Sequence, residues 1–230
     1  MERGSLPRHR DTLRARRRSL VSAGHEKERA NLKITEDLVR RAFGSPVTGD
    51  NARVATDPGH PSLQRAAVAA IFSAAAPLRI LLIKRAKSAN DPWSQHMALP
   101  GGKHDPKDTD LLATAIRETH EELGLDLGAS AEWLGSLPAQ ALSIDGRRLE
   151  IRPFAFVLKG SPVLCPNREV DDVAWVTLES LADGSRDSTV EHLRRGQRLR
   201  FPAWDVEAGQ VWGLTYRMIQ SLLELVAQHA

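Results

Sequence analysis

The sequence predicts a mixed α/β fold in which one β-sheet is flanked by helices. Apolar runs typical of strands alternate with helical patterns, but without the regular strand–helix–strand spacing that would indicate a parallel sheet. The 230 residues suit one domain with extensions. A composition of 41% hydrophobic and 27% charged residues is typical of a chain that buries a core. We therefore expect a single α/β domain over residues 61–230.

We expect residues 1–60 to form a basic, partly flexible extension of this domain. The first 30 residues are rich in arginine and lack apolar periodicity, whereas residues 34–43 place apolar side chains on a helical stripe that ends at Gly44. A solvated arm is the simplest interpretation of the arginines at 14–18, and contact with nucleic acid is the alternative. Residues 45–62, rich in Pro, Gly and Asp, predict a connecting loop.

Cysteine content and hydropathy exclude several classes of protein. The one cysteine, Cys165, cannot form an internal disulfide framework. No apolar run approaches the roughly 20 residues of a membrane helix, and the start of the chain has no apolar signal core. We expect a cytoplasmic protein without a membrane partner, and the arginine-rich start leaves a mitochondrial address open.

Two apolar runs, 66–74 and 78–86, predict a hairpin of buried strands around Pro77. The alanine-rich first run is also compatible with a helix, but the proline and the β-branched run that follows favour a strand.

The second half of the chain predicts further strands and a closing helix. Residues 132–142 and 149–158 predict strands joined through the turn signal Asp145-Gly146. Residues 173–181 predict a strand that runs into a short helix, and 211–228 have the apolar spacing of a long amphipathic helix.

A helix is predicted from Thr109 to Leu123, with Thr109 as its cap and Gly124 as its end. Its apolar residues recur at steps of three and four and define one buried face: Leu111, Leu112, Ala115, Ile116, Thr119 and Leu123.

Three glutamates crowd the end of this helix, at positions 118, 121 and 122. Steps of three and four residues place Glu118 on the same side as Glu121 and Glu122, where like charges repel by a few tenths of a kcal/mol per pair. Acids near a helix C-terminus also oppose the helix dipole. A solvated acidic helix end is one interpretation. A bound Mg²⁺ or Mn²⁺ is the other, because carboxylates are preferred ligands of these ions.

A double glycine, Gly101-Gly102, precedes the helix and is followed by Lys103. Glycines let the backbone approach a ligand closely. The pattern is neither a P-loop nor a dinucleotide-binding fingerprint, because the glycine and hydroxyl positions of those motifs are missing.

Together these residues resemble the Nudix box, which consists of a glycine, an acid and the run R-E-U-x-E-E-x-G-U, where U is a bulky aliphatic residue. Asp108 takes the place of the first glutamate and is one methylene shorter, and Thr119 replaces an aliphatic residue. Six positions match the box: Gly102, Arg117, Glu118, Glu121, Glu122 and Gly124.

The resemblance implies a Nudix-type α/β/α sandwich and a Mg²⁺- or Mn²⁺-dependent pyrophosphohydrolase that cleaves a nucleoside diphosphate linked to another moiety. It implies that the metal ligands are Glu118, Glu121, Glu122 and the carbonyl of Gly101. It also implies that Arg117 orients the glutamates and that an acid outside the box assists them. The best match for that acid is Glu169, and a surface acid at a strand edge is the alternative. The catalytic residues expected are therefore Arg117, Glu118, Glu121 and Glu169.

Substrate contacts are expected from residues around the double glycine. The candidates are Arg85, His96, Gly102 and Lys103. A plain surface position for Arg85 and a packing role for His96 are the alternatives.

The runs LLIKRA, SQHMALPGG and VWGLTYRMI resemble the coenzyme A pyrophosphatase branch of the family. That branch usually has a histidine and a Gly-Gln pair where this chain has residues 93–96, Trp-Ser-Gln-His. CoA or a CoA ester is therefore one expected substrate, and ADP-ribose, NADH, nucleotide sugars and dNTPs stay open.

A non-catalytic module that binds a ligand or regulates a partner is the alternative from a different class. Loss of catalysis in Nudix domains usually removes box glutamates, and all three are present here. The partner expected is a small nucleotide diphosphate. An oligomer is compatible with the sequence.

Deletion of residues 1–30 should leave hydrolysis of a small substrate within a few-fold of the full chain, because a segment without apolar periodicity contributes little to a core. Steady-state kinetics and thermal unfolding of the truncated and full chains test this. Unfolding or loss of turnover in the truncated chain would show that the segment is structural.

Overall fold

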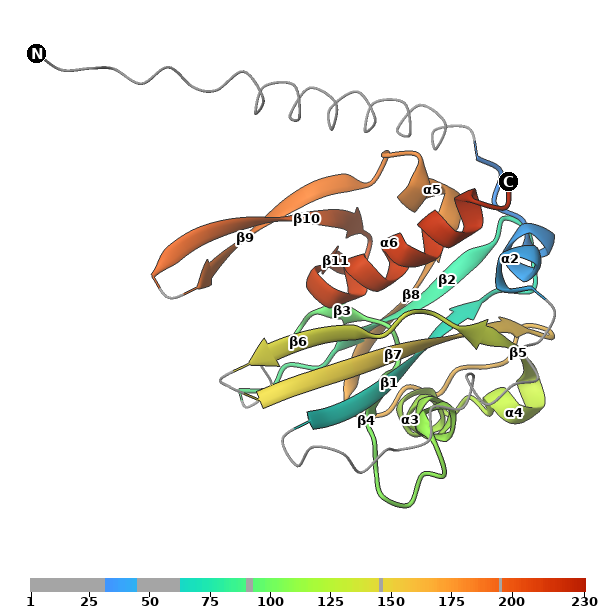
Figure 1. The fold of residues 1–230 in the computed structure, drawn as a ribbon, viewed down its shortest axis with the longest axis horizontal. Helices are drawn as coiled ribbons and strands as arrows, with labels where there is room; N and C mark the ends of the chain where they lie inside the picture. The colour runs from blue at the N-terminus through green and yellow to red at the C-terminus, as the bar shows by residue number, and fades with distance from the viewer. Residues whose placement is uncertain (1–31, 45–62, 90–92, 145–146, 195) are drawn as a thin grey trace, which may run out of the picture.

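The computed structural model describes residues 32–44, 63–89, 93–144, 147–194 and 196–230. The arginine-rich segment, the loop at 45–62 and the turn residues Asp145 and Gly146 lie outside these ranges. The described residues form a mixed sheet between two layers of helices, with a smaller second sheet at one side (Figure 1).

The central sheet has the strand order β3-β2-β1-β7-β5, with β4 paired to β1, β6 to β7 and β8 to β2. Strands β1 and β7 run parallel along their whole length, and the other pairs are antiparallel, so the sheet is mixed as predicted. The strands are β1 (Leu63–Phe72), β2 (Arg79–Arg85), β3 (Met97–Ala98), β4 (Gly101–Lys103), β5 (Ala131–Ser136), β6 (Gln140–Ile144), β7 (Arg147–Leu158) and β8 (Val170–Thr177).

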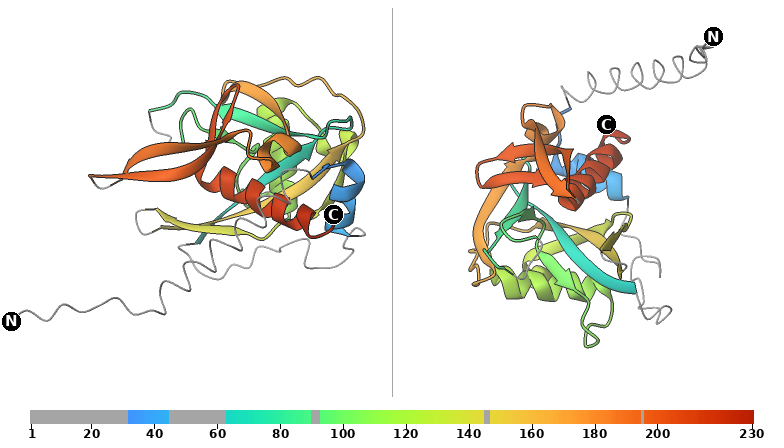
Figure 2. Two further views of the ribbon diagram at one scale, coloured as in Figure 1. Left: turned by 90° about the horizontal axis from the view of Figure 1, so that it is seen from above. Right: turned by 90° about the vertical axis from the view of Figure 1, so that its left-hand side faces the viewer.

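Helices cover both faces of the sheet, which gives the α/β/α layers visible in Figure 2. Helices α3 and α4 lie on one face, and α2 and α6 on the other (Figure 1). None of the described helices is long and apolar enough to cross a bilayer. The helices are α2 (Glu36–Phe43), α3 (Leu111–Leu123), α4 (Leu127–Ser130), α5 (Leu178–Ala182) and α6 (Gly213–Ala227).

Alternate residues of β1 belong to two different hydrophobic cores. Ala70 and Phe72 pack in the core that contains α2 and α6, whereas Ala69 and Ile71 pack in the core that contains α3. Successive strand residues point to opposite faces, so a strand covered on both sides is apolar throughout. This explains why the alanine-rich run is a strand, and the helical alternative for it is wrong.

The predicted hairpin around Pro77 is confirmed. Phe72 pairs with Ile80, and the Ser73 amide donates to the Arg79 carbonyl at 2.9 Å. Beyond this pair, β2 pairs mainly with β8, and β4 takes the place beside β1. The glycine strand β4 is thereby inserted into the sheet next to α3.

The box helix begins one residue later than a Thr109 cap would allow. The side chain of Asp110 accepts the Ala113 amide at 2.8 Å, so Asp110 is the N-cap and the prediction of Thr109 is wrong. Aspartate is among the strongest N-caps, and its carboxylate offsets the positive end of the helix dipole. The predicted end is confirmed, because Gly124 adopts the left-handed conformation at φ 65° and its amide donates to the His120 carbonyl.

A second sheet, of order β11-β10-β9, was not predicted. Its strands are β9 (Asp187–Arg194), β10 (Gln197–Val206) and β11 (Gly209–Trp212). The hairpin of β9 and β10 extends beyond the body of the domain (Figures 1 and 2). The closing helix starts at Gly213 instead of 211, because Val211 and Trp212 pair with β10. Alternation of charged with apolar residues at 198–201 was the signal that could have found this sheet.

Candidate active site

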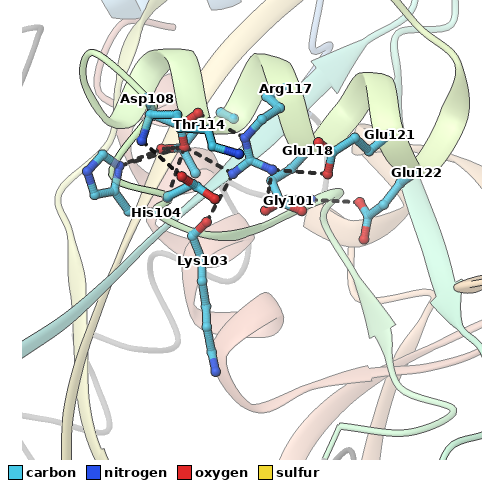
Figure 3. A network of polar contacts seen from close by, with 12 residues as sticks. Gly101, Lys103, His104, Asp108, Thr114, Arg117, Glu118, Glu121 and Glu122 are labelled. Atoms are coloured by element: carbon cyan, nitrogen blue, oxygen red, sulfur yellow. Dashed lines mark hydrogen bonds and ion pairs between the residues drawn. The ribbon is translucent and has the colours of Figure 1, made fainter.

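The site is formed where α3 crosses the face of the sheet beside β4. Arg117, in the middle of α3, joins the acidic side chains into one network (Figure 3). Its partners come from the loop before the helix, from β4 and from the helix itself.

Asp108 anchors the Arg117 guanidinium through two hydrogen bonds. Nε donates to Oδ1 at 2.9 Å and NH2 donates to Oδ2 at 3.0 Å. Oδ2 also accepts from the Thr114 hydroxyl at 2.8 Å and from the Asp105 amide at 3.1 Å. The hydrogen bonds from Arg117 lower the pKa of Asp108 to about 2, although burial acts in the opposite direction. Charge-assisted, bidentate pairs of this kind fix orientation as well as charge.

Asp108 is one methylene shorter than the glutamate of the Nudix box. It nevertheless accepts two hydrogen bonds from Arg117. In the Nudix box, seven residues lie between the first acid and the arginine. In this chain, eight residues lie between Asp108 and Arg117. Asp108 lies in the loop ahead of the Asp110 cap, and the bond of its amide to the Asp105 carbonyl at 2.9 Å curls that loop back toward the helix.

Arg117 also holds two of the box glutamates. NH1 lies 2.9 Å from Glu118 Oε1 and 3.0 Å from Glu121 Oε2, and NH2 donates to the Lys103 carbonyl at 3.1 Å. The pKa of Arg117 is raised, chiefly by its hydrogen bonds with Asp108. One partly exposed cation thus offsets the repulsion within the acidic cluster.

Gly102 and Gly101 make room for the acids. A Cβ at Gly102 would stand 2.5 Å from the carboxyl carbon of Glu118, so that side chain occupies the space above the glycine. Gly101 has φ 145°, and a Cβ there would meet the backbone carbonyl of Ala67. Position 101 therefore requires glycine, whereas a side chain at position 102 would displace the Glu118 carboxylate. The pKa of Glu118 is raised, mainly by burial.

Glu122 is the buried carboxylate of the site, with 3% of the residue exposed. Its Oε2 accepts the Gly101 amide at 2.8 Å, and its Oε1 lies 4.0 Å from the Arg85 guanidinium. Burial raises its pKa to about 8, and the charges of Glu118 and Glu169 act in the same direction. The Gly101 amide and Arg85 oppose this rise but do not cancel it. A carboxylate with such a pKa favours a proton or a cation beside it.

Glu169 reaches the site through a loop that caps the end of α3. The Asn167 amide donates to the Glu122 carbonyl at 2.8 Å, and the Asn167 side chain donates to the Glu121 carbonyl at 2.8 Å. Its Oδ1 accepts the Glu169 amide at 2.7 Å. Asn167 therefore ties the last turn of the box helix to the acid outside the box. Sequence reasoning missed Asn167, whose only signal was an asparagine in a polar loop.

Other expected substrate contacts are placed differently. The Lys103 side chain is exposed and extends away from the acids, and only its carbonyl joins the network (Figure 3). The His96 ring lies 4.8 Å from the Trp212 ring. Arg85 lies beside Glu122, with 29% of its side chain exposed.

The donor set fits a hard divalent cation. Glu118, Glu121, Glu122 and Glu169 outnumber the cations Arg85 and Arg117, and their oxygens are the ligands that Mg²⁺ prefers. Within the described ranges, no group of three His, Cys, Asp or Glu side chains is arranged to hold a metal ion. The carboxylates of Glu118 and Glu121 instead form ion pairs with Arg117. The buried charge of Glu122 and its raised pKa are what a cation would offset.

This fold and this acidic helix define the class of protein. A sequence model of the NUDIX domain matches residues 62–195, and the chain belongs to the Nudix family. The match contains the whole acidic cluster, from the double glycine to Glu169.

Individual proteins are similar to parts of this chain. The human mitochondrial coenzyme A diphosphatase NUDT8 is 33% identical over 139 residues, which cover 57% of this chain and 56% of the relative. The uncharacterized Nudix hydrolase NudL of Photorhabdus laumondii is 30% identical over 151 residues, which cover 65% of this chain and 79% of the relative. The crystal structure of a C. elegans Ap4A hydrolase binary complex aligns with a TM-score of 0.44 at 22% identity, over 51% of this chain and 82% of that one. The matched segments cover 32% and 56% of the length of the first two curated relatives.

Asp108→Asn should destabilise the protein by about 2 kcal/mol at pH 7, because a pKa of about 2 in place of 3.8 represents stabilisation of the folded state. This stabilisation is present above the unfolded value and is lost as the pH falls through 2. The difference in free energy of unfolding between the two proteins should therefore shrink from pH 4 downward in urea titrations. Asp108→Glu, which keeps the charge, is the matched control, and a constant difference at all pH values would contradict the assignment.

Glu122→Gln should stabilise the metal-free protein on the order of 1–3 kcal/mol at pH 7–8, because glutamine still accepts the Gly101 amide without a buried charge. The pKa of Glu122 is raised from 4.5 to about 8, so the folded state binds more protons than the unfolded state in that window. Wild-type stability should consequently fall as pH rises from 4.5 to 8, and the advantage of the variant should grow. Denaturant titrations in EDTA measure it, with Glu121→Gln, at a side chain 54% exposed, as the control. Parallel pH curves for wild type and Glu122→Gln would contradict the buried charge.

Proposed function

We propose that the protein is a metal-dependent pyrophosphohydrolase that cleaves a nucleoside diphosphate linked to another moiety, with CoA or a CoA ester as the substrate. The observation that carries the proposal is the environment of Glu122, a buried carboxylate next to two further glutamates and one arginine. Repulsion and burial of these charges destabilise the folded state. Binding of a cation and a diphosphate would offset that destabilisation and would explain why the cluster is present.

The metal would be held by Glu118, Glu121, Glu122 and the carbonyl of Gly101. Bound Mg²⁺ or Mn²⁺ supplies Lewis-acid stabilisation of the diphosphate charge and activates water for attack. The family membership of the chain supports this use of the cluster.

The residues of the chain divide the remaining work. Arg117, fixed by Asp108, orients the carboxylates of Glu118 and Glu121. Arg85 contributes a positive charge on the substrate side of Glu122, where it suits a phosphate oxygen. Glu169 is exposed and near Glu122, so it is our candidate for the carboxylate that accepts the proton of the attacking water.

The substrate half of the proposal is supported by the likeness to NUDT8, a named coenzyme A diphosphatase. Hydrolysis of CoA at its diphosphate would give 3′,5′-ADP and a phosphopantetheine product. The runs LLIKRA and MALPGG contain Arg85 and Gly101, and the contacts of these two residues with Glu122 support the proposal.

The decisive experiment offers CoA and 3′-dephospho-CoA together, with Mg²⁺, Mn²⁺ or EDTA, and identifies the products by mass spectrometry. We expect cleavage with either metal and negligible cleavage in EDTA. A site built for the 3′-phosphate leaves a cation unpaired when that group is absent, so CoA should have a kcat/KM roughly tenfold higher or more.

Parallel reactions with ADP-ribose, NADH, nucleotide sugars, Ap4A and dNTPs separate the two halves of the proposal. A higher kcat/KM for any of these than for CoA would remove the CoA substrate and leave the pyrophosphohydrolase. Equal cleavage in Mg²⁺ and in EDTA would remove the metal-dependent mechanism itself.

A further inference from the structure

A half-exposed cluster of four rings lies at the base of the second sheet. The Trp212 ring is its centre, with the rings of His96, His192 and Phe201 at 4.8, 5.3 and 5.8 Å. His192 is exposed, and the other three residues are partly exposed. Three come from the second sheet, and His96 comes from the segment before β3.

Strand register places the three rings of the second sheet on one face. Trp212 pairs with Ala203, and His192 pairs with Leu199. Paired residues and residues two apart share a face, so His192, Phe201 and Trp212 point to the same side. The next residue along β9, Leu193, belongs to the opposite face and is 66% exposed.

Attachment of the second sheet to the domain does not depend on this ring cluster. Trp204, 1% exposed, stacks 4.1 Å from Tyr216 of α6, and its indole NH donates to Asp187 at 3.1 Å. Trp204 belongs to the core that contains α6, and the partly buried Tyr216 packs against that core. The ring cluster, in contrast, keeps aromatic surface open to solvent.

The ring cluster is connected to the acidic site through one residue. The Arg85 amide donates to the His96 carbonyl at 3.0 Å, while the Arg85 guanidinium lies 4.0 Å from Glu122. Gln95, at φ 64°, holds this connection, because its side-chain amide donates to the Arg85 carbonyl at 3.2 Å and to Asp171 at 3.3 Å. The paired backbones of Arg85 and His96 therefore put the ring cluster beside the end of β2, whose last residue, Arg85, also lies against Glu122.

We propose that the cluster of His96, His192, Phe201 and Trp212 is a stacking surface for the nucleobase of the substrate. This inference rests on the proposed function, since it takes the diphosphate of the same ligand to lie at the glutamates. Indole, imidazole and phenyl faces suit a planar heteroaromatic ring, and such stacking tolerates different bases. The β9–β10 hairpin is then a determinant of specificity for the nucleoside.

The test compares two ligands that differ only by the nucleoside. α,β-Methylene-ADP carries a diphosphate with a bridge that is not hydrolysed, and methylenediphosphonate is the same anion without the nucleoside. Titration calorimetry with Mg²⁺ measures both. His192→Ala and Phe201→Leu should each weaken methylene-ADP roughly tenfold and leave methylenediphosphonate within about twofold. Leu193→Ala, on the opposite face of the same strand, should change neither.

Unchanged affinity for methylene-ADP in both ring variants would overturn the stacking surface. An equal loss of affinity for methylene-ADP and methylenediphosphonate would also overturn it, because such a loss indicates a structural role for the rings. A change of oligomeric state with unchanged nucleotide affinity would assign the rings to contact between copies instead. Should His192→Ala fail to fold in thermal melts, His192→Gln replaces it. Binding is scored without turnover. If the protein hydrolyses none of the substrates, the proposed function is wrong but the stacking surface is still tested by binding. If methylene-ADP binds no more tightly than methylenediphosphonate, the stacking surface is wrong but the proposed function stands.

Discussion

The orientation of one guanidinium, that of Arg117, governs the acidic site. Like charges on one helix repel, and the site places Glu118 and Glu121 on the helix that also carries Glu122. Asp108 fixes Arg117 from the loop side, and the two glutamates meet its NH1 from the helix side. Because Asp108 itself is held by Thr114 and by the Asp105 amide, the arginine has little freedom to leave the cluster.

Close packing of small residues creates the electrostatics of the site. Ala67 is fully buried under α3, and β4 presents Gly101 and Gly102 to the helix without side chains. Glu118 fills the space over Gly102, and Glu122 comes near enough to accept the Gly101 amide. The same close approach removes water from Glu122 and raises its pKa. Packing of glycine and alanine against a helix thus accounts for the raised pKa of Glu122.

The site also depends on segments that are distant in the sequence. Asn167 closes the last turn of α3 and presents Glu169, while Arg85 arrives at the end of β2. The same arginine bonds to the His96 carbonyl and so links the acids to the second sheet. The surfaces proposed for hydrolysis and for the nucleoside are therefore linked through Arg85, although their residues lie on separate sheets.

Local periodicity and spacing were enough to predict four features: the hairpin of β1 and β2, the amphipathic α6, the common side of the box glutamates, and Gly124 as the helix end. They did not determine that Asp110, not Thr109, caps α3, nor that β9, β10 and β11 form a second sheet, because competing caps and strand pairings are settled by distant contacts. Contacts between distant segments bury Glu122 and leave Glu121 exposed, and they bring Asn167 and Glu169 to the end of the helix. The physical reason is that desolvation depends on which elements meet, and no periodicity along one helix records what will cover it.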